Sequence, residues 1–369
     1  MKRFAGALVM AVLFAGSAQA DDPLLEEAVA FTGQMYHLQS GVPGLLIGAV
    51  RNGERAVAGF GETKPGSGLE PDGDTLIGVA SITKTFTGLV LANLVAEGTL
   101  KLTDPAGPHV GIVDALPERD GQKIRFVDLA THSSGLGREL ESFEGVERYS
   151  DESFQKNLVG DPLMYAPSDG VLYSNIGFDV LGMALSGAAG KPFADLMQEK
   201  VLGPLNLKDS GYGLAQPENA FTGVDWNGNE MPWGKTIPNR FGASQLRTTT
   251  NDMLTYLEWN LDRYSEEGAE ARLLSHAAYV IRDGLAPVFG LDESGHMDAM
   301  GLGWVIMMPE GNRPLIIQKA GGTDGMLSYL AFAPTRGIGV FISINAFDFA
   351  AGMEMAEVIN DLIATLTPR

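Results

Sequence analysis

Four consecutive strand-like segments near the end of the chain constrain its fold more than any other feature. Glycine or proline separates each segment from the next, and in order they read GLGWVIMM, PLIIQKAG, MLSYLAFAP and GIGVFISIN. Short apolar runs with such punctuation predict an antiparallel meander. The segment that follows, AAGMEMAEVINDLIATL, is amphipathic and should pack on that sheet as a helix.

The beginning of the chain supplies a second set of strands. VPGLLIGAV and RAVAGFG flank the turn RNGE, and the helix-like segment DPLLEEAVAFTGQMYHLQ precedes them. Residues 100–239 differ, because they are rich in glycine, proline and short helical pieces. We therefore expect an α+β fold. Residues 21–99 together with 240–369 would form an antiparallel sheet flanked by helices, with a mostly helical subdomain, 100–239, inserted between them and a cleft where the parts meet.

The first 20 residues have the three parts of a secretory signal peptide. Lys2 and Arg3 form a basic start, residues 4–16 form a short apolar run, and the small residues around Ala20 fit a cleavage site. The run is shorter than the roughly 20 residues of a membrane-spanning helix. We expect cleavage after Ala20 and a periplasmic protein, with a buried first helix as the less favoured alternative.

Charge and composition exclude several classes of partner. The formal net charge is −20, and loss of Lys2 and Arg3 makes it −22, which disfavours nucleic-acid binding. With no cysteine, disulfides and thiolate metal sites are excluded. The five histidines have no metal spacing, so we expect no metal and no organic cofactor. We expect no transmembrane span in the mature chain, while peripheral membrane contact stays open.

The stretch VASITKTFTG contains a serine and a lysine three residues apart, Ser81 and Lys84. A helix is predicted from Ile82 to Gly98, and residues at this spacing share one face of a helix. The helix start would favour a developing negative charge at Ser81. At its ordinary pKa only about one lysine in 2,500 is neutral at pH 7, so Lys84 could act as a base only if burial or a second cation lowered that pKa. Two ordinary helix residues remain the alternative.

A second Ser-x-x-Lys, residues 153–156, has no preceding strand and no long apolar helix after it. We interpret it as a surface helix. His132, in LATHSSGL, has no acidic partner beside it in sequence and is interpreted as structural.

The tripeptide YSN, residues 173–175, carries a second pair of polar groups. The hydroxyl of Tyr173 could relay a proton, and the amide of Asn175 could hold a substrate carbonyl. Alternatively, Ser174 or Asn175 caps the helix that begins IGFDVLGMAL. Both interpretations can hold at once.

The stretch KAGG, residues 319–322, lies at the end of the predicted strand PLIIQ. A cation on a strand edge followed by Gly321 and Gly322 would let a substrate backbone or carboxylate approach closely. A strand-ending Lys319 before a glycine turn is the simpler alternative.

In this order, Ser-x-x-Lys, Tyr-Ser-Asn and Lys-x-Gly resemble the penicillin-recognising serine hydrolases, which are the class C β-lactamases and the related low-molecular-mass penicillin-binding proteins. Within this group, the sequence resembles the AmpH-type D-alanyl-D-alanine carboxypeptidase/endopeptidases. The likeness extends over nearly the whole mature chain, and it includes GFGETKPG, LTDP, LATHSSGL, YSNIGFDVLG, GLGWVIMMPEGNRPLIIQKAGG and INDLIATL. It implies a β-lactamase/transpeptidase-like fold.

The resemblance also implies a role for each matching residue. The catalytic group would be Ser81 as nucleophile, Lys84 as its base, Tyr173 as proton shuttle and Lys319 beside the substrate carboxylate. The substrate-binding group would be Asn175, Ala320, Gly321 and Gly322, with the backbone N–H groups of Ser81 and Gly322 as the oxyanion hole.

Ala320 is the one clear departure, since most relatives have threonine there. The missing hydroxyl would weaken carboxylate binding by about 1 kcal/mol or more. Thr323 lies nearby in the sequence.

We expect a hydrolase that acts on peptidoglycan peptides, as a D-Ala-D-Ala carboxypeptidase/endopeptidase, through an acyl-enzyme on Ser81. Its partners would be muropeptides and β-lactams. The alternatives are an esterase or a D-aminopeptidase/amidase on the same fold, a class C β-lactamase, and an inactive cell-wall binding protein.

Overall fold

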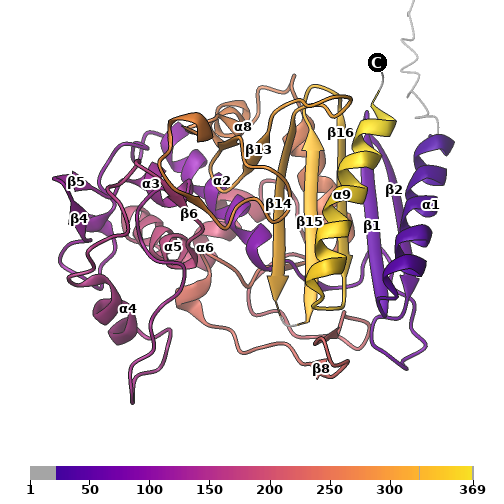
Figure 1. Ribbon diagram of the computed structural model, residues 1–369, viewed down its shortest axis with the longest axis horizontal. Helices are drawn as coiled ribbons and strands as arrows, with labels where there is room; N and C mark the ends of the chain where they lie inside the picture. Colours follow the sequence, from indigo (N-terminus) through magenta and orange to yellow (C-terminus); the bar gives the residue numbers. More distant parts are fainter. Residues whose placement is uncertain (1–21, 324, 368–369) are drawn as a thin grey trace, which may run out of the picture.

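The computed structural model describes residues 22–323 and 325–367. The predicted signal peptide lies outside these residues and stays a prediction. The molecule is organised around an eight-stranded sheet (Figure 1). In spatial order its strands are β10 (Val280–Ile281), β12 (Ala299–Met300), β13 (Val305–Met307), β14 (Ile316–Thr323), β15 (Met326–Ala333), β16 (Ile338–Ile344), β1 (Gly44–Arg51) and β2 (Glu54–Gly61).

All neighbouring strands of this sheet are antiparallel, so the predicted meander is confirmed. The last strand of the meander pairs with the first strand of the chain, which places Leu45 opposite Ile344. This pairing joins the two ends of the sequence into one sheet. The two-residue strands β10 and β12 extend it beyond the predicted meander.

One face of the sheet is covered by α1 (Pro23–Ser40) and α9 (Phe349–Leu366), which lie side by side in Figure 1. Alternate residues of β1, such as Leu45 and Ile47, pack with these helices in one apolar core. Because side chains alternate along a strand, Leu46 belongs to the core on the other face. That core also includes α2 (Thr83–Ala96), α7 (Thr250–Leu261) and α8 (Ala269–His276).

The segment between α2 and α7 is mostly helices and loops, as predicted. Its helices are α3 (Phe126–Ala130), α4 (Asp151–Leu158), α5 (Asn175–Ala189) and α6 (Phe193–Met197), which runs on into a π-helical turn, Gln198–Leu202. It also contains the 3-10 turns Gly107–His109 and Pro238–Arg240, and another 3-10 turn, Arg282–Gly284, follows α8. The domain boundaries at residues 99 and 240 remain a proposal.

Four pairs of two-residue strands tie these loops together. They are β3 (Ile77–Gly78) with β9 (Arg247–Thr248), β6 (Val171–Leu172) with β11 (Val288–Phe289), β4 (Glu118–Arg119) with β5 (Gln122–Lys123), and β7 (Gly223–Val224) with β8 (Glu230–Met231). The second Ser-x-x-Lys lies in α4, where Lys156 pairs with Glu152 at 3.0 Å. This segment is therefore helical and its lysine is exposed, as predicted.

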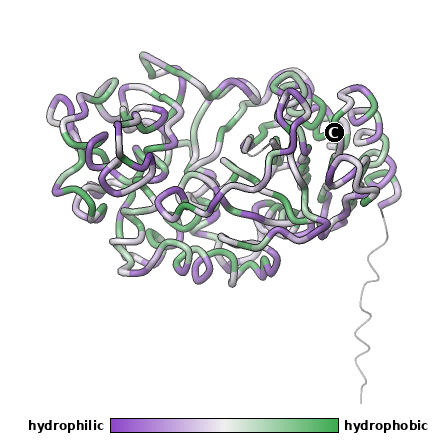
Figure 2. Tube along the Cα trace, turned by 90° about the horizontal axis from the view of Figure 1, so that it is seen from below, coloured by the Kyte–Doolittle hydropathy of each residue, from purple (hydrophilic) through white to green (hydrophobic). Residues whose placement is uncertain are grey.

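Within the described part of the chain, no helix has the length and apolar character needed to cross a membrane. Hydrophobic and hydrophilic stretches alternate along the trace instead (Figure 2).

Candidate active site

Ser81 stands on a tight turn between a strand and a helix. Strand β3 leads into a 3-10 turn, Ala80–Ile82, and α2 begins only at Thr83. Ser81 therefore precedes the α-helix, whose start was predicted one residue earlier. Ala80 has φ 45°, a conformation that is unfavourable for a residue with a side chain. Strain of this kind is concentrated at functional sites, because the surrounding structure must hold it in place.

Strand β14 passes very close to this turn at Gly321. A Cβ atom added there would lie 2.3 Å from the carbonyl oxygen of Val79 and 3.1 Å from the backbone nitrogen of Ser81. Only glycine permits this approach. Gly321 was predicted to let a substrate approach the strand edge, which stays a prediction, and the structure shows that it also allows β14 to pack against the Ser81 turn.

The four predicted catalytic residues come together at one point. The Oγ atom of Ser81 lies 3.0 Å from Lys84 Nζ and 2.6 Å from the hydroxyl oxygen of Tyr173. The Nζ atoms of Lys84 and Lys319 lie 5.1 Å and 5.2 Å from the centroid of the Tyr173 ring. These groups come from the turn before α2, from α2 itself, from the segment that leads into α5 and from β14, so only the folded chain assembles them.

The amine of Lys84 is surrounded by oxygen atoms. Besides Ser81, it contacts Asn175 Oδ1 at 2.7 Å and the Ala243 carbonyl oxygen at 2.8 Å. Burial, and next the charge of Lys319, hold the pKa of Lys84 well below its usual range. A neutral amine has two N–H groups, which the two carbonyl oxygens can accept. Its lone pair then faces the hydroxyl of Ser81, which can donate a proton to it.

Tyr173 and Lys319 have shifted pKa values for the same main reason, which is burial. It raises the pKa of Tyr173 to about 12, so the phenol keeps its proton and can donate it to Ser81. It lowers the pKa of Lys319 to about 7, although the nearby Glu293 opposes this shift. The Lys319 amine donates a hydrogen bond to the carbonyl oxygen of Ala320 at 2.7 Å.

For the Tyr-Ser-Asn segment, the helix-capping interpretation is confirmed, while the proton relay by Tyr173 and the substrate contact of Asn175 stay predictions. Ser174 caps α5, because its Oγ accepts a hydrogen bond from the Gly177 N–H at 2.8 Å. The same hydroxyl donates to the Gly137 carbonyl oxygen at 2.7 Å. Asn175 donates from its backbone to the Arg138 carbonyl oxygen at 2.9 Å and from its side chain to the Glu139 carboxylate. The loop 137–139 is thereby fixed against the start of α5.

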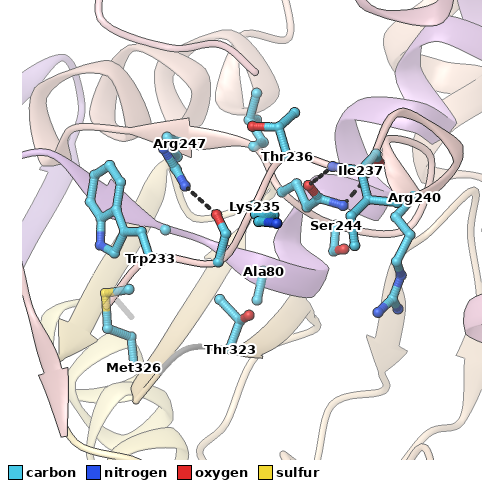
Figure 3. A pocket seen from close by; sticks show the side chains of 14 residues that line it. Ala80, Trp233, Lys235, Thr236, Ile237, Arg240, Ser244, Arg247, Thr323 and Met326 are labelled. Carbon is cyan, nitrogen blue, oxygen red and sulfur yellow. Dashed lines mark hydrogen bonds between the residues drawn. The ribbon is translucent and has the colours of Figure 1, made fainter. Parts of the chain in front are cut away.

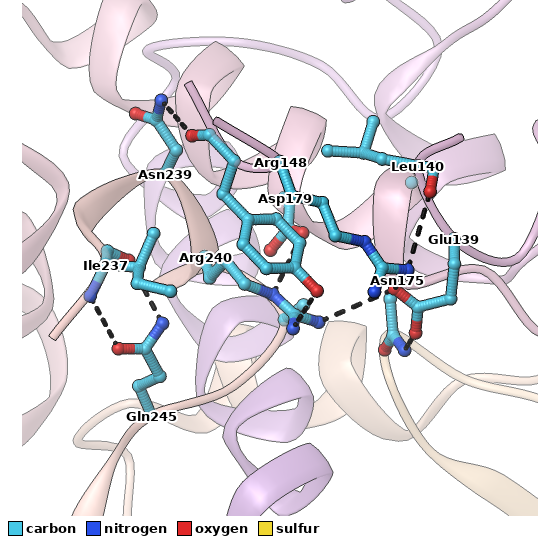
Figure 4. A network of polar contacts seen from close by, with 12 residues as sticks. Glu139, Leu140, Arg148, Asn175, Asp179, Ile237, Asn239, Arg240 and Gln245 are labelled. Atoms are coloured by element: carbon cyan, nitrogen blue, oxygen red, sulfur yellow. Dashed lines mark hydrogen bonds and ion pairs between the residues drawn. The ribbon is translucent and has the colours of Figure 1, made fainter. Parts of the chain in front are cut away.

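Charged residues surround the Glu139 carboxylate that binds the Asn175 side chain (Figure 4). Arg148 and Arg240 each lie 3.9 Å from the Glu139 carboxylate, and Arg240 lies 3.6 Å from the buried carboxylate of Asp179. Burial raises the pKa of Asp179 to about 7. Since Glu139 accepts from the side-chain nitrogen of Asn175, the amide oxygen is left facing Lys84. Sequence reasoning missed this network, because its members are far apart along the chain and share no motif.

His132 is buried beside Tyr173, with 4.6 Å between the ring centroids. Its Nδ1 accepts a hydrogen bond from the Ser174 N–H at 3.0 Å. Burial, followed by the charge of Lys84, lowers its pKa well below the usual range, so the ring is neutral. His132 thus supports the backbone of the Tyr-Ser-Asn segment, as its structural interpretation anticipated.

A cavity of about 310 Å³ opens above Ser81. Seven of the eight predicted site residues line it, namely Ser81, Tyr173, Asn175, Lys319, Ala320, Gly321 and Gly322. The eighth, Lys84, is fully buried beneath Ser81. The cavity also has an apolar wall, formed by Leu291, Leu327, Phe347, Phe349 and Met353. Three charged residues that sequence reasoning did not identify complete the lining, and these are Arg138, Glu139 and Glu293.

A second cavity, of about 180 Å³, is lined by Ala80, the residue before Ser81 (Figure 3). Its walls include Ala80, Thr323, Met326 and residues of the segment 233–247, among which Trp233 stacks with Arg247 at 4.0 Å. Thr323 was the hydroxyl nearest in sequence to the unusual Ala320. It lines this second cavity, so it is not positioned as a replacement beside Lys319.

Known proteins resemble this chain in sequence and in structure. The sequence matches the family described as Beta-lactamase over residues 14–364. It is 32% identical over 333 residues to the D-alanyl-D-alanine-carboxypeptidase/endopeptidase AmpH of Escherichia coli, covering 89% of this chain and 86% of that protein. A beta-lactamase/D-alanine carboxypeptidase from Yersinia pestis has a similar structure, with a TM-score of 0.83, 29% identity and coverage of 93% and 99%. The esterase EstB of Burkholderia gladioli is 32% identical over 201 residues, which cover 47% of this chain and 49% of the esterase.

Proposed function

This chain is a serine hydrolase of the beta-lactamase family, and from that premise we propose that it cleaves peptidoglycan peptides next to D-Ala. Its β-lactamase/transpeptidase-like fold is the one that the sequence resemblance implied. The proposed reactions are removal of a terminal D-Ala and hydrolysis of a D-Ala cross-link. The substrate class is supported by the AmpH and Yersinia relatives, whose names include carboxypeptidase activity. The proposed location is the periplasm, on the basis of the predicted signal peptide with cleavage after Ala20.

The observation that carries the proposed mechanism is the environment of the Lys84 amine. Two carbonyl oxygens accept its N–H groups, and the Ser81 hydroxyl lies 3.0 Å away. Lys84 takes the proton of Ser81, and the Oγ attacks the carbonyl carbon of the scissile amide. The resulting oxyanion is stabilised by the backbone N–H groups of Ser81 and Gly322.

Tyr173 is placed to complete the acylation step. Its phenol contacts Ser81 Oγ at 2.6 Å, so it can pass a proton to the amine that leaves as the C–N bond breaks. The acyl group then remains on Ser81 as an ester. The proton that Lys84 took from Ser81 restores the Tyr173 phenol. In the second half of the reaction, water gives a proton to Lys84 as it attacks the ester, and a proton returns to Ser81 Oγ as the product acid leaves.

Parallel assays of the purified protein test this proposal. One assay measures D-Ala release from a peptide that ends in D-Ala-D-Ala, and the other measures hydrolysis of a short neutral ester. We expect D-Ala release that a penicillin blocks. Hydrolysis of the ester with no release of D-Ala, from either peptides or isolated muropeptides, would show that the substrate class is wrong.

One observation favours an esterase as the second candidate. Ala320 supplies no hydroxyl for a substrate carboxylate, and the exposed side chains of Phe349 and Met353 extend the apolar wall of the cavity. Such a wall suits an uncharged, apolar leaving group. The partial match to an esterase agrees with this reading. The two assays above separate the candidates.

Replacing Tyr173 with phenylalanine tests the proton shuttle. The ring is buried, so Tyr173→Phe should keep its packing against His132 while removing the hydrogen bond to Ser81. We expect kcat/KM for the peptide to fall about 100-fold or more, the usual contribution of a positioned acid–base group. Steady-state kinetics of D-Ala release measure the effect. If Tyr173→Phe retained full activity, proton transfer would have to follow another route.

A further inference from the structure

Arg138 is a cation that lines the cavity and takes no part in the proposed mechanism. It lies in the loop 137–139 that three hydrogen bonds from Ser174 and Asn175 hold in place. Its guanidinium carbon lies 4.8 Å from the centroid of the Tyr173 ring. An arginine stacked on an aromatic face keeps the edge of its fork free for hydrogen bonds.

Gly290 provides the space that Arg138 occupies. This residue has φ +70°, and a Cβ atom there would come within 3.0 Å of Arg138 Nη1 and 3.2 Å of Tyr173 Cβ. The loop that carries Gly290 is held by a hydrogen bond from the Tyr173 N–H to the Phe289 carbonyl oxygen at 3.1 Å. The loop that binds the backbone of Tyr173 therefore also limits where the Arg138 guanidinium can lie.

The Arg138 guanidinium forms no ion pair with any residue in the described ranges, 22–323 and 325–367. The neighbouring Glu139 is already held by Asn175, with Arg148 and Arg240 close behind it. Glu293, exposed on the cavity wall, is the other acidic residue that lines the cavity. An exposed arginine fork beside the nucleophile is thus available to an anionic ligand.

The other groups on and near β14 are poorly suited to bind an anionic group of a substrate. Ala320 has no hydroxyl, and Thr323 lines the second cavity. Lys319 already donates to the Ala320 carbonyl oxygen, and because burial lowers its pKa to about 7 it is only partly charged at neutral pH. An arginine, in contrast, stays fully charged at any physiological pH.

We propose that Arg138 binds the C-terminal carboxylate of the substrate, in place of the hydroxyl that is missing at Ala320. This inference rests on the proposed peptidase function and adds a determinant of its specificity. Arg138 acts here as a substrate-binding residue, and the proton transfers remain with Lys84 and Tyr173.

The test compares an acylated D-Ala-D-Ala peptide with its C-terminal amide, which lacks the negative charge. For each variant, the ratio of kcat/KM for the acid to kcat/KM for the amide is measured. In Arg138→Ala we expect this ratio to fall about 10- to 100-fold, which is the range expected for a lost charge-assisted hydrogen bond. Arg138→Lys should give an intermediate ratio, because it keeps the charge without the fork. Adding Ala320→Thr to Arg138→Ala should restore part of the ratio.

Arg263→Ala is the matched control, since it removes the same charge from an exposed arginine in the loop after α7. Its ratio should equal that of the wild type. If Arg138→Ala lowers the rates for acid and amide equally, or leaves both unchanged, the proposal is wrong. The proposal is also wrong if Arg138→Ala changes only the pH dependence of kcat/KM and leaves the ratio of acid to amide unchanged. That result would indicate that Arg138 only balances the charge of Glu293.

A second substrate pair separates this inference from the proposed function. Acylation of Ser81 by a penicillin and by its methyl ester offers the same comparison of acid with uncharged ligand. If the wild type cleaves neither peptide, the peptidase function is wrong. The penicillin pair still decides the role of Arg138, because the ratio of acylation rates must fall in Arg138→Ala.

Discussion

Replacing Ser81 with alanine is expected to abolish covalent labelling by a penicillin. In the wild type, we expect the Oγ of Ser81 to open the β-lactam ring and to keep the whole molecule as an ester. The intact mass of the protein should therefore increase by the full mass of the penicillin. Alanine has no oxygen to form that ester, and the remaining polar groups cannot replace it. We expect no adduct in Ser81→Ala and a loss of peptide hydrolysis of about 10⁶-fold, as in other enzymes that lose their nucleophile.

The second Ser-x-x-Lys supplies a matched control for this experiment. Ser153→Ala removes a serine at the same spacing from a lysine, but in α4. Its mass increase should equal that of the wild type. A thermal unfolding curve shows whether both variants are folded. An adduct on Ser81→Ala, or a loss of the adduct in Ser153→Ala, would place the nucleophile elsewhere in the chain.

The central sheet could be predicted from the sequence because its long strands are periodic and clearly punctuated. The hairpin of β1 and β2, the meander of β13 to β16 and helix α9 all appear where the pattern places them. Most of the two-residue strands were not predicted, since a run of two residues has no period. Strand β6, for example, is defined by its parallel partner β11, which lies more than 100 residues away in the sequence.

The candidate catalytic residues could be named because each belongs to a short motif, and the order of the motifs carried the family resemblance. Three other contributors carry no such signal. Ala243 takes part through its backbone carbonyl oxygen, which any residue could provide. Glu139 and Arg138 reach the cavity only because the loop 137–139 is bonded to the start of α5. A contact of that kind is formed by tertiary structure, so the local sequence does not reveal it.

The proposed role of Lys84 as the general base predicts how activity responds when its amine is removed. Lys84→Met keeps an unbranched chain of similar length in a fully buried site. Without the general base, we expect the rate of penicillin acylation to fall about 10³- to 10⁴-fold, measured from the time course of fluorescent penicillin labelling. Lys156→Met, which removes an exposed lysine from α4, should leave that rate unchanged. Equal rates in Lys84→Met and the wild type would exclude Lys84 as the base.

The same variant tests the protonation state directly. Burial puts the folded pKa of Lys84 well below the ordinary lysine value of 10.5. Between those two pKa values the unfolded chain binds a proton that the folded chain does not, so the wild-type free energy of unfolding increases with pH. This contribution is lost as the pH falls through the folded pKa, and Lys84→Met lacks it. Urea unfolding from pH 6 upward should therefore show the wild type gaining stability over Lys84→Met as the pH rises. Parallel curves would mean that folded Lys84 keeps its proton, and a protonated lysine could not accept one from Ser81.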